Sequence, residues 1–299
     1  MSRSRAMPPN KQTLEPKFAL RVEQLLGKRI ASAQKVKTGY SATERWLVST
    51  QSSLRYFVKI GATLPSADAI RHEAWVYEHL QLACMPLVVS WQDDEVAPML
   101  VLEDLSDLEW PPPWSERTIA AALETIEQIH TSRGALRSYE ERNGTEWDWW
   151  RAIEREPEAF LRLDMVSREW LQDSLPALLE SAGSVSPAGD RVVHCDLRSD
   201  NFCFSAKETR LVDWSLACLG NPKLDLGLFL PGLAADQGPS PEEILPREPG
   251  IASWVAGFFA WHASKPFIPS APGVREMQRT LLRKALPWAI SELNLAAVA

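Results

Sequence analysis

The first hundred residues consist of short apolar runs separated by polar turns. Runs of this length, bounded by turn residues, predict a meander of antiparallel strands. The predicted strands are residues 29–36, 45–50, 54–60, 86–91 and 98–102. Between the third and fourth strands, residues 68–82 carry apolar side chains at helical spacing, which predicts a helix packed on the sheet. This part of the chain therefore predicts a small α+β lobe with an antiparallel sheet and one main helix.

The pattern changes after Asp104. Residues 109–114 read Glu-Trp-Pro-Pro-Pro-Trp; proline fixes φ and removes a backbone donor, so this stretch is predicted to be a connector. Helical spacing then dominates, with Ser115 or Thr118 as the predicted N-cap of the first helix. The predicted helices are residues 115–130, 145–155, 157–181, 241–262 and 274–295, and the predicted strands are residues 191–204 and 209–214. We expect two lobes, residues 1–104 and a larger, mainly helical lobe of residues 105–299.

Composition narrows the class of protein. The chain has 299 residues, of which 45% are hydrophobic and 24% are charged, and only 4 cysteines. These values exclude a disordered chain, a collagen-like repeat and a disulfide scaffold. Residues 251–263 form the longest apolar stretch, which is too short for a membrane span. Residues 1–12 are basic without a following apolar region, so no secretory signal is predicted and a cytoplasmic location is expected.

The net charge of −7 is unevenly distributed. Residues 1–104 contain 13 Lys+Arg and 11 Asp+Glu, so the rest of the chain carries a net charge of −9. An acidic lobe disfavours a nucleic-acid partner and favours a cationic one. An acidic surface that only promotes solubility is the alternative.

One stretch contains the residue types that phosphoryl transfer requires. An apolar run ends at Val193 and is followed by His194, Asp196 and, five residues later, Asn201; Asp213 follows a second apolar run. Phosphoryl transfer needs a carboxylate that orients or accepts the acceptor proton, together with hard oxygen ligands for Mg²⁺. The spacing predicts Asp196 as the catalytic residue and Asn201 and Asp213 as metal ligands.

The pattern His-x-Asp-x4-Asn, followed by Leu-Val-Asp-Trp, resembles the aminoglycoside phosphotransferase and choline kinase family. The resemblance implies a bilobal protein-kinase-like fold and a kinase that uses ATP and Mg²⁺ to phosphorylate a small hydroxyl compound. It also implies that His194 orients the catalytic loop. The chain departs from the family at Cys195, where glycine is usual.

Further residues match the family's nucleotide site in the expected order. Lys59 matches the strand lysine that contacts the α- and β-phosphates, and Glu73 matches its ion-pair partner. The loop of residues 38–43 would cover the phosphates. The resemblance implies nucleotide-binding roles for Gly39, Ser41, Lys59, Glu73, Glu103 and Leu105. It also implies a structural contact between Asp225 and the catalytic loop.

The acceptor site is expected in the helical lobe. Residues 139–173 contain ten Asp+Glu and five Arg, and residues 146–150 read Glu-Trp-Asp-Trp-Trp. Aromatic faces beside carboxylates attract ammonium groups, so Glu146, Asp148 and Trp149 are predicted to contact a cationic acceptor. The alternative is that these tryptophans belong to the core, since Trp147 and Trp150 lie at helical spacing.

Other functions fit the sequence less well. One alternative is a catalytically inactive, nucleotide-binding scaffold of the same fold. Such a scaffold would not need the catalytic residue types, so their presence argues against it. A protein kinase would be expected to have an Ala-Pro-Glu-like segment after Asp213, and none occurs. The spacing of the cysteines matches no zinc pattern.

Overall fold

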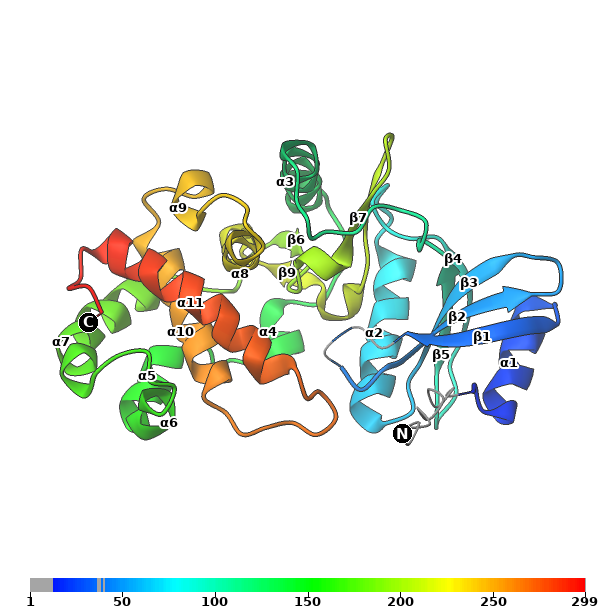
Figure 1. Cartoon of the computed structure of the whole chain (residues 1–299), viewed down its shortest axis with the longest axis horizontal. Coiled ribbons are helices and arrows are strands. Elements are labelled where there is room, and N and C mark those ends of the chain that lie inside the picture. Colours follow the sequence, from blue (N-terminus) through cyan, green and yellow to red (C-terminus); the bar gives the residue numbers. More distant parts are fainter. Residues whose placement is uncertain (1–12, 37–38, 40, 299) are drawn as a thin grey trace, which may run out of the picture. The chain divides into compact units, whose positions relative to one another are not determined.

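The computed structural model describes residues 13–36, 39 and 41–298. These residues form two compact units, and the first comprises residues up to 71 together with residues 87–107. The second unit comprises residues 72–86 and those from 108 onward (Figure 1). Residues 1–12, for which no secretory signal is predicted, lie outside the described residues, as do residue 37 and positions 38 and 40 of the predicted phosphate loop.

The first unit is built on a five-stranded antiparallel sheet in the order β1-β2-β3-β5-β4 (Figure 1). Its strands are β1 (Ile30–Val36), β2 (Glu44–Thr50), β3 (Arg55–Ile60), β4 (Val88–Gln92) and β5 (Met99–Glu103). All five lie where the apolar runs predict them. The sequence pattern therefore predicted this sheet correctly, strand by strand.

Helix α1 (Pro16–Leu26) packs on one face of this sheet. Phe18 and Val22 contact a core that includes Trp46, Val58 and Val101. This helix was not predicted, although Pro16 at its first turn and a left-handed C-cap at Gly27 are ordinary helix boundary signals. Because side chains alternate along a strand, the residues between those core positions face the other side of the sheet.

Helix α2 (Leu64–His79) begins in the first unit and ends in the second. The sequence interpretation placed all of residues 1–104 in one lobe. That boundary stays a prediction, and in the structure residues 72–86 belong to the second compact unit, where they form hydrogen bonds. His72 Nε2 lies 2.9 Å from the carbonyl oxygen of Ala217, and the backbone N–H of Leu211 donates to the carbonyl of Cys84 at 2.8 Å.

The second unit is mainly helical. Its helices are α3 (Glu116–Thr131), α4 (Tyr139–Asn143), α5 (Trp149–Arg155), α6 (Pro157–Leu161), α7 (Arg168–Gly183), α8 (Pro222–Ala235), α9 (Pro241–Ile244), α10 (Pro249–Ala263) and α11 (Val274–Leu293). Its strands are β6 (Arg191–Val193), β7 (Phe202–Phe204), β8 (Thr209–Leu211) and β9 (Cys218–Gly220). They form two small antiparallel pairs, β6 with β9 and β7 with β8. The predicted α+β class is confirmed.

Two helices predicted as continuous are interrupted. The predicted helix 157–181 is divided into α6 and α7 by Asp164, whose φ is 55°. The predicted helix 241–262 is divided into α9 and α10 near Arg247, whose φ is 60°. A residue in the left-handed region ends a right-handed helix. The helical spacing of apolar residues continues on both sides of this residue, which is why the sequence predicted one helix.

Buried helix α10 forms the centre of the second unit and packs against α5, α7 and α11. Trp150 Nε1 donates to the carbonyl of Ser253 at 2.8 Å. Gly257 allows this approach, since a Cβ added there would come within 2.8 Å of that nitrogen. Among the helices of the described residues, none has both the length and the apolar character that crossing a membrane requires.

Candidate active site

The loop after β6 carries the predicted catalytic residue, and Asp225 of α8 holds its backbone. Asp225 Oδ2 accepts the N–H of His194 at 2.9 Å, and Oδ1 accepts that of Cys195 at 2.7 Å. Cys195 has a φ of 61°, in the region where glycine is favoured. The loop therefore keeps this backbone conformation although the residue is not glycine.

Asp225 is buried, and its carboxylate also contacts a residue outside the loop. His130 Nε2 lies 3.0 Å from Asp225 Oδ2. Burial opposes ionisation of Asp225, but the hydrogen bonds from His130 and from the His194 backbone outweigh it and lower the pKa of the carboxyl group. An ionised Asp225 thus joins α3, α8 and the loop, as the resemblance implied.

His194 orients the loop as a neutral imidazole. Its Nδ1 accepts the backbone N–H of Asp196 at 3.3 Å, and its Nε2 lies 3.1 Å from the carbonyl oxygen of Val212. This pattern assigns the proton to Nε2. Burial lowers the pKa of His194 to about 4, so the ring stays neutral near pH 7. The ring links the loop to the strand end before Asp213.

Both carboxylate oxygens of Asp196 have partners within the loop. Arg198 Nη1 donates to Oδ1 at 2.9 Å, and Asn201 Nδ2 donates to Oδ2 at 3.2 Å and to the Asp196 carbonyl at 2.8 Å. Burial raises the pKa of Asp196 to about 6; Arg198 opposes this shift, while Asp213 and Asp200 add to it. The side chain is about one-fifth exposed, so an acceptor can still reach it.

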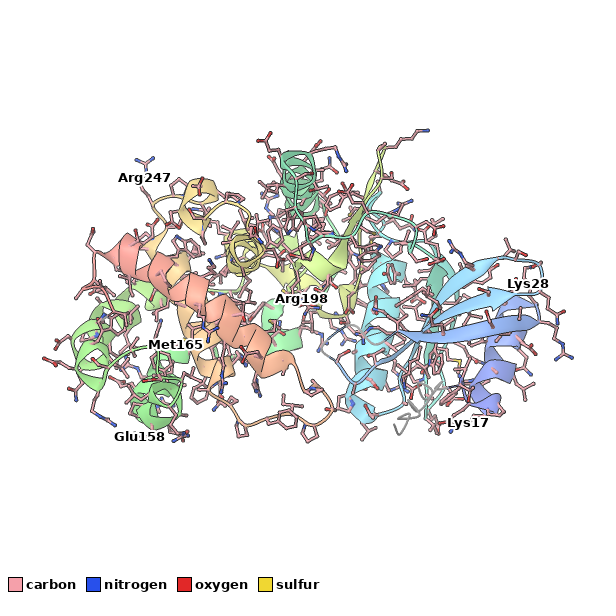
Figure 2. All side chains as sticks on the ribbon, viewed as in Figure 1. Lys17, Lys28, Glu158, Met165, Arg198 and Arg247 are labelled. Atoms are coloured by element: carbon pink, nitrogen blue, oxygen red, sulfur yellow. The ribbon has the colours of Figure 1, made fainter. Side chains whose placement is uncertain are left out.

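Arg198 is a site residue that the sequence interpretation missed. Figure 2 labels Arg198 in the second unit. Its Nε and Nη2 donate to Asp200 at 2.9 and 3.3 Å, while Nη1 donates to Asp196. The sequence pattern Asp-x-Arg-x-Asp could have indicated this role for Arg198. Each aspartate lies two residues from the arginine, so in an extended turn both carboxylates can reach the same guanidinium.

Asn201 and Asp213 flank the paired strands β7 and β8, since Asn201 directly precedes β7 and Asp213 lies just after β8. The backbone N–H of Val212 donates to the carbonyl of Asn201 at 2.9 Å, which sets the two segments side by side. Asp213 follows β8 with a φ of 68°, and Ser215 Oγ donates to its Oδ1 at 3.3 Å. The predicted metal ligands are thus brought to neighbouring strand ends.

The donor set of these two residues fits Mg²⁺. Asn201 uses Nδ2 on Asp196, so its amide orientation leaves Oδ1 for a cation, and Asp213 adds a carboxylate. Both are the hard oxygen ligands that Mg²⁺ prefers, with waters and phosphates completing the shell. Among the described residues, no group of three or more His, Cys, Asp or Glu has metal-binding geometry.

The first unit carries the predicted phosphate-binding residues. Lys59 lies on β3 and is almost completely buried. Gly39 has a φ of 100°, and Ser41 Oγ accepts a hydrogen bond from Arg45 Nη2 at 2.8 Å. Glu73 is buried on the part of α2 that belongs to the second unit, where the hydroxyl of Tyr77 donates to it at 3.4 Å. The Lys59–Glu73 ion pair stays a prediction.

The predicted hinge residues follow β5. Glu103 is bonded within its own sheet: its Oε1 accepts the N–H of Leu87 at 2.9 Å, and its own N–H donates to the Leu87 carbonyl at 3.0 Å. Arg55 Nε lies 2.8 Å from the carboxylate of Asp104. Leu105 is half-buried at the end of the first unit. These contacts hold the segment after β5 in place. Contact of Glu103 and Leu105 with adenine stays a prediction.

The predicted acceptor residues differ in their surroundings. Glu146 is exposed, whereas Asp148 is the N-cap of α5 and accepts the N–H of Arg151 at 3.0 Å. Trp149 is half-buried, with its ring 5.0 Å from His262. Trp150 is core, as the alternative interpretation of this segment expected.

Comparison with solved structures confirms the fold. A ternary complex of a thermostable mutant of aminoglycoside phosphotransferase APH(4)-Ia with ADP and hygromycin B is 13% identical, with a TM-score of 0.59 over 95% of this chain and 100% of that one. An aminoglycoside phosphotransferase from Alicyclobacillus acidocaldarius is 13% identical, with a TM-score of 0.57 over 97% and 96%. A choline kinase from Cryptosporidium parvum is 10% identical, with a TM-score of 0.51 over 89% and 88%. Among curated proteins, none matches this sequence.

The fold is protein-kinase-like, and the loop after β6 brings Asp196 and Asn201 close to the segment of Asp213, which are the residue types that phosphoryl transfer requires. The sequence matches the model of the phosphotransferase enzyme family over residues 32–267, which is most of the chain. The chain belongs to this family. The predicted resemblance and the predicted enzyme class, an ATP-dependent phosphotransferase with an alcohol group as acceptor, are therefore confirmed.

Proposed function

We propose that this protein is a small-molecule kinase that transfers the γ-phosphate of ATP to a hydroxyl group of a small, cationic acceptor. The observation that carries the proposal is the catalytic loop, in which Asn201 and Arg198 fix the Asp196 carboxylate while Asp213 lies at the adjacent strand end. Such an acceptor would be an aminoglycoside, an amino sugar or a choline-like alcohol.

Each residue of the loop has a distinct role in this proposal. Asp196 accepts a hydrogen bond from the acceptor hydroxyl, which directs its oxygen toward the γ-phosphorus. Asp196 takes the hydroxyl proton as the bond from this oxygen to the γ-phosphorus forms and the bond from that phosphorus to the β–γ bridging oxygen breaks, so that ADP leaves. His194 holds the loop backbone as a neutral imidazole, so it adds no competing charge near Asp196.

The remaining roles concern the nucleotide and its metal. Asn201 and Asp213 would hold Mg²⁺, which when bound would neutralise charge on the phosphates. Lys59, paired with Glu73, contacts the α- and β-phosphates, and Gly39 and Ser41 lie in the loop that covers them. The backbone at Glu103 and Leu105 meets the adenine. The first unit is thus the nucleotide lobe, and the second supplies catalysis and the acceptor site.

A cationic acceptor is favoured by charge. The chain after residue 104 carries a net charge of −9, and only part of this is the metal-binding acids. Glu146 and Asp148 are exposed carboxylates close in sequence to the half-buried Trp149, and carboxylates together with an aromatic ring attract ammonium groups. None of the four cysteines, all of which the structure describes, forms a disulfide, as expected for a protein of the reducing cytoplasm.

A turnover screen tests the proposal. Purified protein with Mg²⁺ and ATP is assayed against cationic hydroxyl compounds, with neutral sugars as controls and Asp196→Ala as the matched variant. We expect phosphorylation of a cationic compound by the wild type, and at least a thousandfold loss in Asp196→Ala with nearly unchanged ATP binding. Normal turnover by Asp196→Ala contradicts the assignment of the catalytic residue.

The same screen separates the alternatives. Phosphorylation of neutral or anionic acceptors alone contradicts the cationic acceptor class. ATP binding without transfer to any acceptor indicates an inactive nucleotide-binding scaffold. Transfer to protein substrates but not to small alcohols indicates a protein kinase.

A further inference from the structure

Ser199 opens the short turn that carries Asn201. The two residues are the first and last of a single 3₁₀ turn in the catalytic loop. The N–H of Phe202 donates to the carbonyl of Ser199, and the N–H of Asn201 donates to the carbonyl of Arg198 at 3.0 Å. One 3₁₀ turn has few hydrogen bonds of its own and their geometry is poor. The position of Asn201 therefore depends on contacts that reach the turn from other elements.

The hydroxyl of Ser199 is held from two sides. Trp114 Nε1 donates to Ser199 Oγ at 3.1 Å, and Ser199 Oγ in turn donates to Oδ2 of Asp236. Ser199 itself is buried. Because the hydroxyl accepts one hydrogen bond and donates another, its orientation is fixed. The side chain thus joins the catalytic loop to the segment before α3 and to the end of α8.

Trp114, which ends the proline-rich connector, is itself fixed by aromatic packing. Its ring makes edge contacts with Phe202, Phe204 and Phe229, at centroid distances of 6.2, 5.9 and 5.9 Å. The connector also pairs with strand β7, since Glu109 and Phe204 exchange both backbone hydrogen bonds at 2.9 Å. The indole N–H that reaches Ser199 therefore comes from a side chain with a defined position.

Helix α8, which contacts β6 (Figure 1), holds the loop at two points. Asp225 in its first turn accepts the N–H groups of His194 and Cys195, and Asp236 is its C-cap. An α-helix has 3.6 residues per turn, so these two positions, about three turns apart, lie on nearly the same side. A carboxylate at the C-terminal end of a helix is unfavourable for the helix. The contribution of Asp236 is therefore its bond to Ser199.

We infer that Ser199 is a positioning residue: held by Trp114 and Asp236, it fixes the turn that places Asn201 and thereby sets the affinity for Mg²⁺ together with a nucleotide. Mg²⁺ requires nearly ideal octahedral geometry, so a small displacement of one ligand weakens its binding. The inference rests on the proposed function, which supplies the nucleotide and the metal. In the pattern His-x-Asp-x4-Asn, Ser199 is one of the unspecified positions, and neither Trp114 nor Asp236 belongs to the pattern.

ADP binding measured with Mg²⁺ and with EDTA tests this role without requiring catalysis. Calorimetry gives the Kd of ADP under both conditions for the wild type and for Ser199→Ala, which removes the hydroxyl. We expect the Kd with Mg²⁺ to rise about tenfold in the variant, as is typical when a residue that orients a metal ligand is lost. The Kd in EDTA should stay that of the wild type, because the affected contact is with the metal.

Two further variants remove the partners of the hydroxyl. Trp114→Phe keeps an aromatic ring but loses the N–H, and Asp236→Ala loses the acceptor. Each should raise the Kd with Mg²⁺ several-fold and leave the Kd in EDTA unchanged. Combined with Ser199→Ala, neither should add to its effect, because all three residues act through the same hydroxyl.

Controls separate this role from a general loss of stability. Ser199→Thr keeps the hydroxyl and should restore most of the Mg²⁺-dependent affinity. Ser205→Ala removes a hydroxyl that accepts the N–H of Lys207 at 3.1 Å in the turn after β7, and it should bind ADP as the wild type does. If Ser199→Ala does not fold, Trp114→Phe decides: wild-type ADP affinity with Mg²⁺ in that variant overturns the inference.

The outcomes distinguish this inference from the proposed function. Wild-type ADP affinity with Mg²⁺ in folded Ser199→Ala, or an equal loss with Mg²⁺ and with EDTA, overturns the positioning role even if the wild type is an active kinase. ADP binding that Mg²⁺ strengthens through Ser199, without transfer to any hydroxyl acceptor, supports the role and contradicts the proposed function. A wild type that binds ADP under neither condition overturns both.

Discussion

The carboxylate of Asp225 accepts the backbone N–H of Cys195 at 2.7 Å, across 30 residues of sequence. Cys195 immediately precedes Asp196 and has a left-handed backbone. The position of Asp196 therefore depends on a helix that is distant in sequence and makes no direct contribution to the reaction.

Removing this carboxylate should disorder the loop. Asp225→Ala leaves two buried N–H groups without acceptors, so we expect a loss of about 2–5 kcal/mol in the free energy of unfolding. Asp225→Asn keeps one acceptor oxygen and should lose less. Urea unfolding measures both variants, with kcat recorded for the folded fraction. Wild-type stability of Asp225→Ala would show that the loop is held by other contacts.

Phosphoryl transfer should fall at acidic pH with a midpoint near 6. Burial raises the pKa of Asp196 from 3.8 to about 6, so the carboxyl group gains a proton as the pH falls through this value. A protonated Asp196 cannot accept the proton of the acceptor. A pH profile of kcat/KM between pH 5 and 8 tests this, with circular dichroism confirming the fold at each pH. A rate that is flat down to pH 5 contradicts the role of Asp196.

Arg198 should affect kcat more than substrate affinity. It holds Asp196 Oδ1 while Asp200 holds its own guanidinium, so Arg198→Met should misplace the carboxylate and lower kcat about a hundredfold. Arg198→Lys, which keeps one charged donor, should recover part of this loss. Exposed Arg191 on β6 offers the matched control, Arg191→Met, with unchanged kcat. An increase in the KM of ATP at constant kcat would instead place Arg198 on the nucleotide.

Asp148 can be tested separately as a helix cap and as an acceptor ligand. Serine is also a good N-cap, so Asp148→Ser keeps the cap of α5 and removes the charge, whereas Asp148→Ala removes both. If the carboxylate binds the acceptor, both variants should raise the KM of a cationic acceptor several-fold, and a neutral one should be unaffected. If only Asp148→Ala changes, through a stability loss of about 1 kcal/mol, Asp148 is a cap and nothing more.

Local patterns predicted the elements that local forces determine. Ser115 caps α3 as predicted, with its Oγ accepting the N–H of Thr118 at 3.2 Å. The five strands of the first unit follow their apolar runs, because side-chain alternation and turn residues act within a few positions. The same kind of pattern gave a wrong prediction at Asp164 and Arg247. Helical apolar spacing continues past these residues, but their left-handed backbone ends the helix.

The sequence by itself determined the chemistry available to this protein: Asp196 and Asn201 lie in one short loop, so their types and spacing identify a phosphotransferase without knowledge of the fold. Tertiary structure decided the contacts between distant elements. The resemblance implied that Asp225 contacts the loop, but only the structure shows its two oxygens on the backbone N–H groups of His194 and Cys195. His72 on α2 likewise meets the carbonyl of Ala217 across 145 residues. Such contacts depend on how distant elements pack against each other. Local residue spacing does not encode this packing, so it cannot be recognised from the sequence pattern.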